Sequence, residues 1–517
     1  MEEDPKFARR TTLNLVTEIL CVVLTTVIGL VMVPYYIDQL GMSAYAVVPL
    51  ATSVSSYMII VANCFGNAIN RFFIVALEKD GGKDANTTYS TSLRLMFGIA
   101  VVLLPVTAVI SYFCPMIFNV PDNSYDSVRI LFLCEFWCSI LLNFGTCFNN
   151  VMYVFNKTYV INTIRSTYLL AQIVFTILLF LAFGPRLEYI GYSYMIGIAM
   201  YVLFSYLVMK RSFPELHYDG KAADRAMAAD IGRLALWAAI VKIGNLMFLQ
   251  ASLILTNLFL GSETQGGFSL VVSMVSMIGT ACNAITNIFS PFYYRYFSER
   301  KMGDMVSVAL LGIKVLSIAI ALPLAYVCIF SPEIFTFWVG GEYVYLEDTV
   351  WVMFILLMFN AVCGVIDMIP TVMLKVAQAA MITAVTGLLN IVLAVFFLNF
   401  TDWGILGVAA AYTIAMTLRN GIILPIFIAR IVGEGHFVFV KPMAWGYLVF
   451  LLALAVCYGL SLVWDVQGTF LSLLASALVL YVPFTLLALR FGLRRNEKDM
   501  LAMSMPEKMS KVLIKLI

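Results

Sequence analysis

The chain has 517 residues, of which 62% are hydrophobic and only 12% charged, and its formal net charge is +2. Soluble domains carry about 25% charged residues, so this composition excludes an ordinary water-soluble protein. The near-balanced charge gives no electrostatic footprint for a nucleic-acid partner. The ten cysteines lie almost entirely in apolar runs without a CxxC pair, and both histidines fall in hydrophilic loops. We therefore expect no metal site and no cofactor.

The apolar runs along the chain are long enough to cross a membrane, which takes about 20 residues per helix. The first run is full length and follows a polar segment, so we expect a retained helix rather than a cleaved signal peptide. In chain order, spans are expected near 14–36, 45–73, 92–113, 128–152, 159–182, 189–209, 233–260, 267–293, 306–330, 349–373, 379–399, 404–429, 442–464 and 468–490. The sequence thus predicts an all-α polytopic membrane protein of about fourteen transmembrane helices.

The lysines and arginines fall almost entirely on one side of these spans. With a cytoplasmic N-terminus, 25 of the 32 lie on the cytoplasmic side, two lie outside and five lie within spans. Positive charge marks the cytoplasmic side. This predicts a cell (inner or plasma) membrane protein with both termini in the cytoplasm. No connection is long enough for a soluble domain, which disfavours membrane enzymes with a large external catalytic loop.

An internal repeat relates the two halves of the chain. A shift of 220 residues places Leu40-Gly41 on Leu260-Gly261, Asn63 on Asn283, and Arg94 on Lys314. Two six-helix lobes of like orientation would enclose a central cavity suited to alternating access. The predicted organisation is an N-lobe (1–209), a cytoplasmic linker (210–232), a C-lobe (233–430), two further helices (442–490) and a basic amphipathic cytoplasmic tail (491–517).

Several cations lie within the expected spans, where a charge is costly unless it faces a wet cavity or a partner. Lys242 shares a helix face with Asn245 and is expected to line a cavity. Arg165 and Arg419 either line that cavity or pair with a buried carboxylate. Arg94 and Lys314 lie close enough to the inner surface to extend into it. Converging cations suit an anionic headgroup, phosphate above all.

Three carboxylates also fall within spans: Glu18, Glu135 and Asp367. Buried carboxylates suit proton or sodium coupling. The alternative for Glu135 and Asp367 is a structural ion pair with Arg165 or Arg419.

Two stretches resemble a known family. Gly41 to Tyr45, after the first span, and Asn67-Ala68-Ile69-Asn70-Arg71-Phe72, at the end of the second, look like the polysaccharide-transporter (Wzx-like) flippases. These belong to the multidrug/oligosaccharidyl-lipid/polysaccharide (MOP) superfamily, with the multidrug extruders and the peptidoglycan lipid flippases. The resemblance implies a V-shaped, two-lobed flippase that moves a polyprenyl-(pyro)phosphate-linked oligosaccharide to the outer leaflet. It also implies that Arg71, Arg165, Lys242 and Arg419 receive the headgroup and that Glu18 serves ion coupling.

Other functions stay open at this point. A cation-coupled extruder of drugs or metabolites is disfavoured by the two extra spans and by a predominance of basic over acidic residues within spans. A membrane glycan polymerase or glycosyltransferase would need a catalytic carboxylate cluster in a sizeable outer loop, whereas the outer acids lie in two short loops. A scaffold without transport is a further alternative. The expected partners are the lipid-linked oligosaccharide, membrane lipids, and glycan polymerases or ligases, and the protein itself is not expected to be an enzyme.

Overall fold

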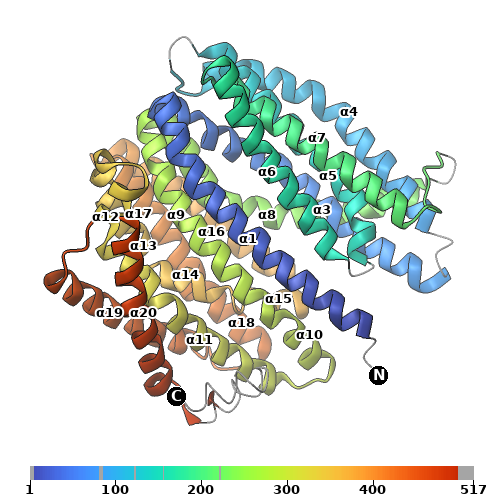
Figure 1. Ribbon diagram of the computed structural model, residues 1–517. Coiled ribbons are helices and arrows are strands. Elements are labelled where there is room, and N and C mark those ends of the chain that lie inside the picture. Colours follow the sequence, from blue (N-terminus) through green and yellow to red (C-terminus); the bar gives the residue numbers. More distant parts are fainter. Residues whose placement is uncertain are drawn as a thin grey trace. The chain divides into compact units, whose positions relative to one another are not determined.

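The computed structural model describes residues 5–80, 85–121, 124–154, 157–220, 223–495 and 497–498, with the side chains of 5–12, 15, 61–63, 67, 71, 74–80, 154, 234, 236–238, 240 and 241 left out. Within these residues the secondary structure is helical, without a strand (Figure 1). This confirms the all-α prediction. The chain divides into two compact units, Met1–Ser269 and Leu270–Ile517, and each is described by itself.

Unit 1 is a bundle of long helices around α5. Its elements are α1 (Pro5–Leu40), α2 (Met42–Tyr45), α3 (Val47–Asp80), α4 (Ala85–Ile117), α5 (Tyr125–Val154), α6 (Thr158–Phe183), α7 (Leu187–Ser212) and α8 (Arg225–Leu260). α5 packs against α3, α4 and α7, while α8 lies along α3 and α6 lies along α7. Gly41 and Gly261 end α1 and α8 with φ of 80° and 89°, a backbone conformation that glycine adopts without strain. The pair matched by the repeat thus has the same structural role.

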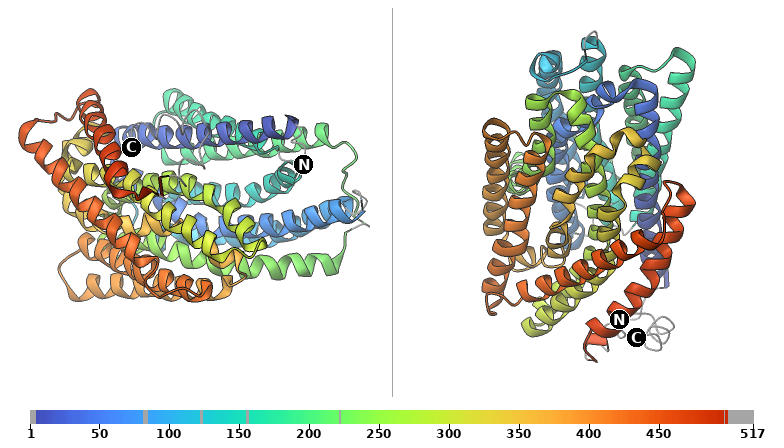
Figure 2. Two further views of the ribbon diagram at one scale, coloured as in Figure 1. Left: turned by 90° about the horizontal axis from the view of Figure 1, so that it is seen from below. Right: turned by 90° about the vertical axis from the view of Figure 1, so that its left-hand side faces the viewer.

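Unit 2 is organised around α11 (Met302–Ile329), which packs along α19 (Val440–Val463) and against α20 (Phe470–Gly492) (Figure 2). The unit begins within α9 (Ser262–Thr286). Its other elements are η1 (Asn287–Phe289), α10 (Ser290–Ser298), α12 (Ser331–Trp338), η2 (Gly341–Leu346), α13 (Glu347–Phe354), α14 (Leu357–Cys363), α15 (Ile369–Val372), α16 (Val376–Phe400), α17 (Ile405–Thr417), η3 (Leu418–Ile423) and α18 (Leu424–Val432).

The number of membrane spans agrees with the prediction. Thirteen helices in the described part are long and apolar enough to cross a bilayer, and a bent helix pair raises the count to fourteen. Burial also separates two kinds of helix. In the apolar membrane-spanning stretch of α1, only 11% of the residues are buried within the protein. The corresponding share is 61% for α5 and 67% for α11. An apolar helix with so little protein around it requires lipid as its solvent, so the chain is a multi-pass membrane protein.

One expected span departs from a continuous helix. The run 349–373 is divided into α13, α14 and α15, and the segment Gly341–Phe354 is bent by 51° against Leu357–Cys363. Turns fill the gap between α14 and α15, where Gly364 and Asp367 lie. Pro370 stands in the first turn of α15, where its missing N–H costs no helical hydrogen bond. Turn-forming residues therefore interrupt a run that hydropathy alone reads as one helix.

A close contact between α11 and α19 depends on a glycine. A Cβ at Gly446 would overlap Ser317 Oγ, and small residues at such crossings let membrane helices pack. We expect Gly446→Leu to destabilise the protein by about 1–3 kcal/mol, the usual cost of overpacking, seen as a lower unfolding temperature in detergent. Gly459→Leu is the control, since a Cβ at Gly459 on the same helix meets nothing within 4 Å. Equal stability of the two variants would contradict the close packing.

Candidate functional site

Unit 1 contains a buried carboxylate on α5, the helix that packs against α3, α4 and α7. Glu135 on α5 is 7% exposed, and its Oε1 accepts a hydrogen bond of 3.3 Å from Thr52 Oγ1 on α3. Ser55, one turn further along α3, places a second hydroxyl group near this carboxylate. No described lysine or arginine forms an ion pair with Glu135. A carboxyl group in such surroundings is stable either protonated or beside a bound cation, because an unpaired buried charge is very costly.

Thr52 connects this carboxylate to a cavity. The cavity has a volume of about 290 Å³, and Thr52 lines it together with residues of α1, α2, α3, α6, α7 and α8. Its polar walls are Tyr36, Tyr45, Thr52, Ser53, Gln172, Tyr194 and Gln250. The side chains of Tyr36 and Tyr194 lie close to each other. Tyrosine and glutamine side chains therefore line the cavity. The Glu135 carboxylate lies behind this wall and is hydrogen-bonded to Thr52, which lines the cavity.

The wall of this cavity does not include Lys242, Arg165, Glu18 or Arg94, four of the expected site residues in unit 1. Lys242 is exposed on α8 and lies near Cys64 of α3. Arg165 is exposed on α6 and lies near Tyr168, and Glu18 is exposed on α1. The ion pair with Glu135 that the sequence left open as an alternative for Arg165 is not formed among the described residues, and Thr52 is the hydrogen-bond partner of Glu135 instead. The side chain of Arg71 lies outside the described residues, as does the part of the tail beyond residue 498.

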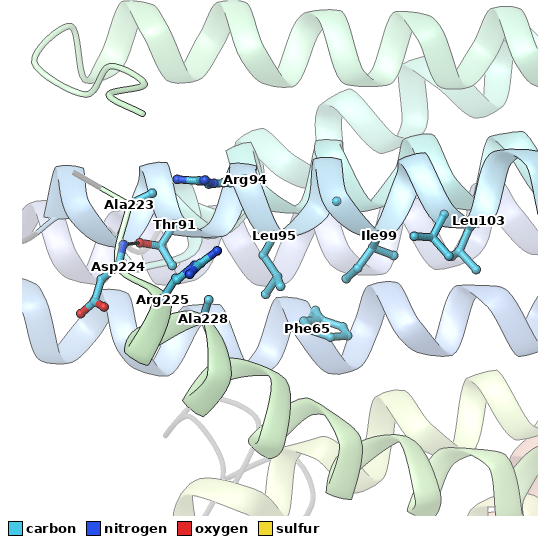
Figure 3. Close-up of a pocket in the computed structure, with 12 residues that line it drawn as sticks. Phe65, Thr91, Arg94, Leu95, Ile99, Leu103, Ala223, Asp224, Arg225 and Ala228 are labelled. Atoms are coloured by element: carbon cyan, nitrogen blue, oxygen red, sulfur yellow. Dashed lines mark hydrogen bonds between the residues drawn. The ribbon is translucent and has the colours of Figure 1, made fainter. Parts of the chain in front are cut away.

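Arg94 belongs to a second cavity, of about 580 Å³, between α3, α4 and the start of α8. Figure 3 shows its guanidinium and that of Arg225 on either side of Thr91 at one end of this cavity. Arg94 Nη1 donates to the backbone carbonyl of Gly220 at 3.4 Å. Arg94 therefore keeps most of its donors free of described protein partners.

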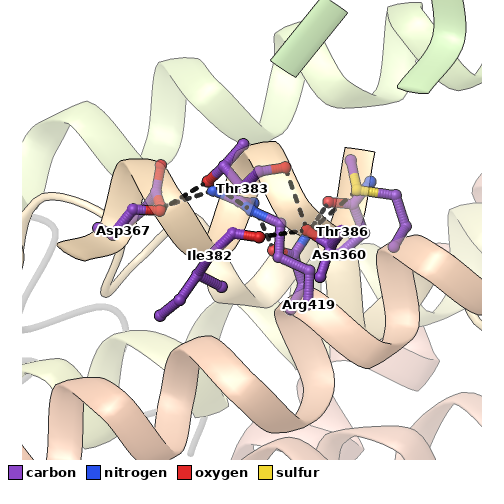
Figure 4. A network of polar contacts seen from close by, with 9 residues as sticks. Asn360, Asp367, Ile382, Thr383, Thr386 and Arg419 are labelled. Carbon is purple, nitrogen blue, oxygen red and sulfur yellow. Dashed lines mark hydrogen bonds and ion pairs between the residues drawn. The ribbon is translucent and has the colours of Figure 1, made fainter. Parts of the chain in front are cut away.

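Unit 2 contains a polar network around Arg419 (Figure 4). Arg419 is 8% exposed. Its Nη2 lies 3.5 Å from Asp367 Oδ1, its Nε donates to Thr383 Oγ1 at 3.0 Å, and its Nη1 donates to Asn420 Oδ1. Asn420 Nδ2 donates in turn to Asn360 Oδ1. The sequence left Glu135 and Asp367 open as ion-pair partners of Arg419. In the structure, Arg419 forms its ion pair with Asp367.

The backbone around this network is irregular. Arg419 and Asn420 stand in the π-helical segment Leu418–Ile423, and Asp367 lies in the turns of the broken span. Single-turn π segments are frequent at functional sites. Non-helical backbone at membrane depth is tolerated only where protein buries it or water reaches it, and the Asp367 side chain is 53% exposed. The network is therefore a buried arginine with one accessible carboxylate partner.

Lys314 has a structural partner. Its Nζ lies 2.5 Å from Glu497 Oε1 and 5.8 Å from the ring centroid of Trp445. Nearby, Leu493 is 5% exposed and packs with Leu311 and Ile318 of α11. These contacts fasten the chain after α20 to the side of α11. A headgroup role for Lys314 stays a prediction, because this ion pair would have to open first.

We expect Lys314→Met to loosen this C-terminal fastening. Both side chains of the pair are about four-fifths buried, so its loss is worth about 1 kcal/mol. That corresponds to roughly fivefold more of the detached form. Trypsin cleavage at Arg494 and Arg495 should accelerate by about that factor, since cleavage follows the open population. Lys441→Met, an exposed lysine on α19, is the control. Unchanged cleavage would show that the pair does not hold the segment.

The described part of the chain contains no cluster of three His, Cys, Asp or Glu side chains that could hold a metal ion. The ten cysteines are buried and unpaired. The residues that sequence reasoning missed are neutral: Thr52, Asn360, Thr383 and Asn420. An Asn-Gly pair beside the one arginine of an apolar run was the available signal for Asn420.

Comparisons with known proteins extend over nearly the whole chain. No protein-family model matches the sequence. A relative described as the uncharacterized membrane protein EpsK of Bacillus subtilis (strain 168) is 22% identical over 489 residues, 95% of this chain and 97% of the relative. The lipid II flippase MurJ, in an inward closed conformation, has a TM-score of 0.66 at 15% identity, covering 92% of this chain and 100% of MurJ. The MATE transporter VcmN of Vibrio cholerae has a TM-score of 0.60 at 12% identity, covering 87% and 98%.

These likenesses define the class of the protein: a multi-pass α-helical membrane protein with the fold of the MOP-superfamily transporters. An inward-facing MATE transporter of that superfamily has a TM-score of 0.59 at 13% identity, covering 84% of this chain and 95% of its own. The expectation of a MOP-type fold is confirmed. Within this fold, more of the present chain is matched by MurJ than by either MATE transporter.

Proposed function

We propose that the protein is a flippase that translocates a polyprenyl-(pyro)phosphate-linked oligosaccharide from the cytoplasmic to the outer leaflet by alternating access. The observation that carries this proposal is the structural likeness to a lipid II flippase along that protein's whole length, with a TM-score of 0.66. The chain builds this fold from apolar helices with no large loop between them. A membrane enzyme would need a sizeable outer loop for its catalytic carboxylates, so this organisation favours a transporter.

The proposed orientation and organisation follow the charge distribution. Both termini lie in the cytoplasm of a cell membrane protein, because 25 of 32 lysines and arginines then fall on that side. The N-lobe comprises 1–209, the C-lobe 233–430, and the helices of 442–490 are additions to the repeat. Glycan polymerases or ligases that use the translocated product are the proposed partners.

Arg419 is the proposed headgroup contact with the most defined geometry. Thr383 and Asn420 hold its guanidinium from inside the protein, while Asp367 approaches only to 3.5 Å and is half exposed. A phosphate would replace Asp367 with shorter, bidentate hydrogen bonds. Lys242, Arg165, Arg71, Lys314 and Arg94 are the further proposed cations. Glu135, with Glu18 and Asp367 as alternatives, is the proposed site of proton or sodium coupling.

A second candidate function is a cation-coupled extruder of drugs or metabolites. It is favoured by one observation: the cavity beside Glu135 is lined by tyrosines, glutamines and apolar side chains, with no lysine or arginine in its wall. Such a cavity suits a cationic amphiphile, which aromatic faces attract. The likeness to MATE transporters is compatible with this alternative.

The test is depletion of the protein in its native cell, followed by measurement of lipid-linked oligosaccharide in each leaflet. The flippase predicts accumulation in the inner leaflet, relieved by the wild-type gene. Arg419→Ala and Lys242→Ala should fail to relieve it, whereas Arg186→Ala, an exposed arginine at the start of α7, should succeed. Unchanged lipid-linked oligosaccharide combined with a new sensitivity to cationic toxicants would reject the flippase and favour the extruder.

A further inference from the structure

The cavity beside Arg94 in unit 1 has one polar end and a long apolar remainder (Figure 3). Its volume is about 580 Å³. Arg94 of α4 and Arg225 of α8 flank Thr91 at the polar end. The apolar remainder follows α4 and α3 and consists of Phe65, Leu95, Gly98, Ile99, Val102 and Leu103. The cavity is thus amphipathic along its length, as a lipid is.

The two arginines are available to a ligand. Both are exposed, and neither forms an ion pair with a carboxylate in the described part of the chain. The acid in the cavity wall is Asp224, whose Oδ1 accepts from the backbone N–H of Ala226 and so caps α8. Figure 3 shows this carboxylate turned away from the two guanidinium groups. The polar end is therefore cationic.

The apolar part of the cavity is continuous with the lipid-facing surface of α4. Val102 lines the cavity and is 62% exposed, and Phe97 and Val101 beside it are similarly exposed. Gly98 leaves the trough open, since a Cβ there would meet nothing within 4 Å. A hydrocarbon chain can therefore enter the trough sideways from the bilayer without displacing protein.

We propose that this cavity binds an anionic bilayer phospholipid. Arg94 and Arg225 clamp its phosphate, and one acyl chain lies along the trough beside Gly98. Guanidinium groups bind phosphate oxygens bidentately, and basic residues near an anionic bilayer surface attract such headgroups. The polar end has neither a side-chain amide nor an aromatic ring to read a sugar, which favours an ordinary phospholipid over an oligosaccharide-bearing one. The site goes beyond the proposed transport function and does not depend on it, and it takes Arg94 out of the proposed cations for the transported headgroup.

Lipid binding to the purified full-length protein tests the proposal, measured by native mass spectrometry with phosphatidylglycerol and with phosphatidylcholine of the same chains. Arg94→Gln/Arg225→Gln should weaken phosphatidylglycerol binding at least about tenfold and remove its preference over phosphatidylcholine. Gly98→Phe should obstruct the trough and weaken binding of the same lipid without changing any charge. The matched controls are Arg186→Gln and Gly459→Phe, which should both bind as wild type does.

Three results would overturn the proposal: equal binding of the two phospholipids by the wild type, undiminished phosphatidylglycerol binding by Gly98→Phe, or loss of binding in the controls as well. A polyprenyl phosphate that displaces phosphatidylglycerol from the wild type at equal concentration would also overturn it, by making the cavity a site for transported lipid. Because none of these readouts measures translocation, they stand apart from the leaflet assay that tests the flippase.

Discussion

Replacing Glu135 with glutamine is expected to reduce transport at least about tenfold and to abolish its response to a proton or sodium gradient. Glutamine keeps the shape of the side chain and still accepts a hydrogen bond from Thr52, so the fold is preserved. It has no carboxylate to bind a proton or a cation, and the coupling step is therefore lost. Flux into proteoliposomes with an imposed gradient measures this effect.

The stability of the Glu135→Gln variant separates coupling from folding. A neutral amide costs less to bury than a carboxyl group that must stay protonated or cation-bound, so the unfolding temperature should stay the same or rise. Glu263→Gln is the matched control, because Glu263 is exposed in the first turn of α9. Undiminished, gradient-sensitive flux in Glu135→Gln would remove Glu135 as the coupling site and leave Glu18 and Asp367 as candidates.

Replacing Arg419 with alanine is expected to abolish transport and to lower stability by about 2 kcal/mol. Removing one partner of a buried ion pair costs about 3–5 kcal/mol, and the half exposure of Asp367 reduces this cost. Thr383 and Asn420 also lose a donor inside the protein. The leaflet assay measures the first effect, and thermal unfolding in detergent measures the second.

The Asp367→Asn variant shows whether Arg419 binds the headgroup or only forms a structural ion pair with Asp367. If phosphate displaces Asp367 from Arg419, the Asp367→Asn variant should bind the headgroup at least as tightly as wild type, because the competing charge is gone. If the pair only fastens the broken span, Asp367→Asn and Arg419→Ala should lose stability together, and a double-mutant cycle should show coupling without a transport-specific defect. That second pattern would contradict the headgroup proposal for Arg419.

Most of the fold followed from the sequence because hydropathy and helix length are local properties. Each span must satisfy its own backbone hydrogen bonds in lipid, so a run of about 20 apolar residues predicts a helix wherever it lies. The expected fourteen spans and the fold class were accordingly correct. The broken span 349–373 was not foreseen, because the run stays apolar enough to predict one continuous helix despite Gly364 and Pro370.

For the candidate site, the sequence identified several of the residues, whereas the tertiary structure was needed to find their partners. Sequence alone identified Glu135, Asp367 and Arg419, because a charge inside an apolar run is conspicuous and costly. Only the tertiary structure paired Arg419 with Asp367, gave Glu135 a hydroxyl partner on α3, and attached Lys314 to Glu497. It also brought Arg94 to Arg225, 131 positions further along the chain, at one end of a cavity. The reason is physical: the cost of burying a charge belongs to the residue itself, whereas the group that offsets this cost comes from whichever helix packs beside it.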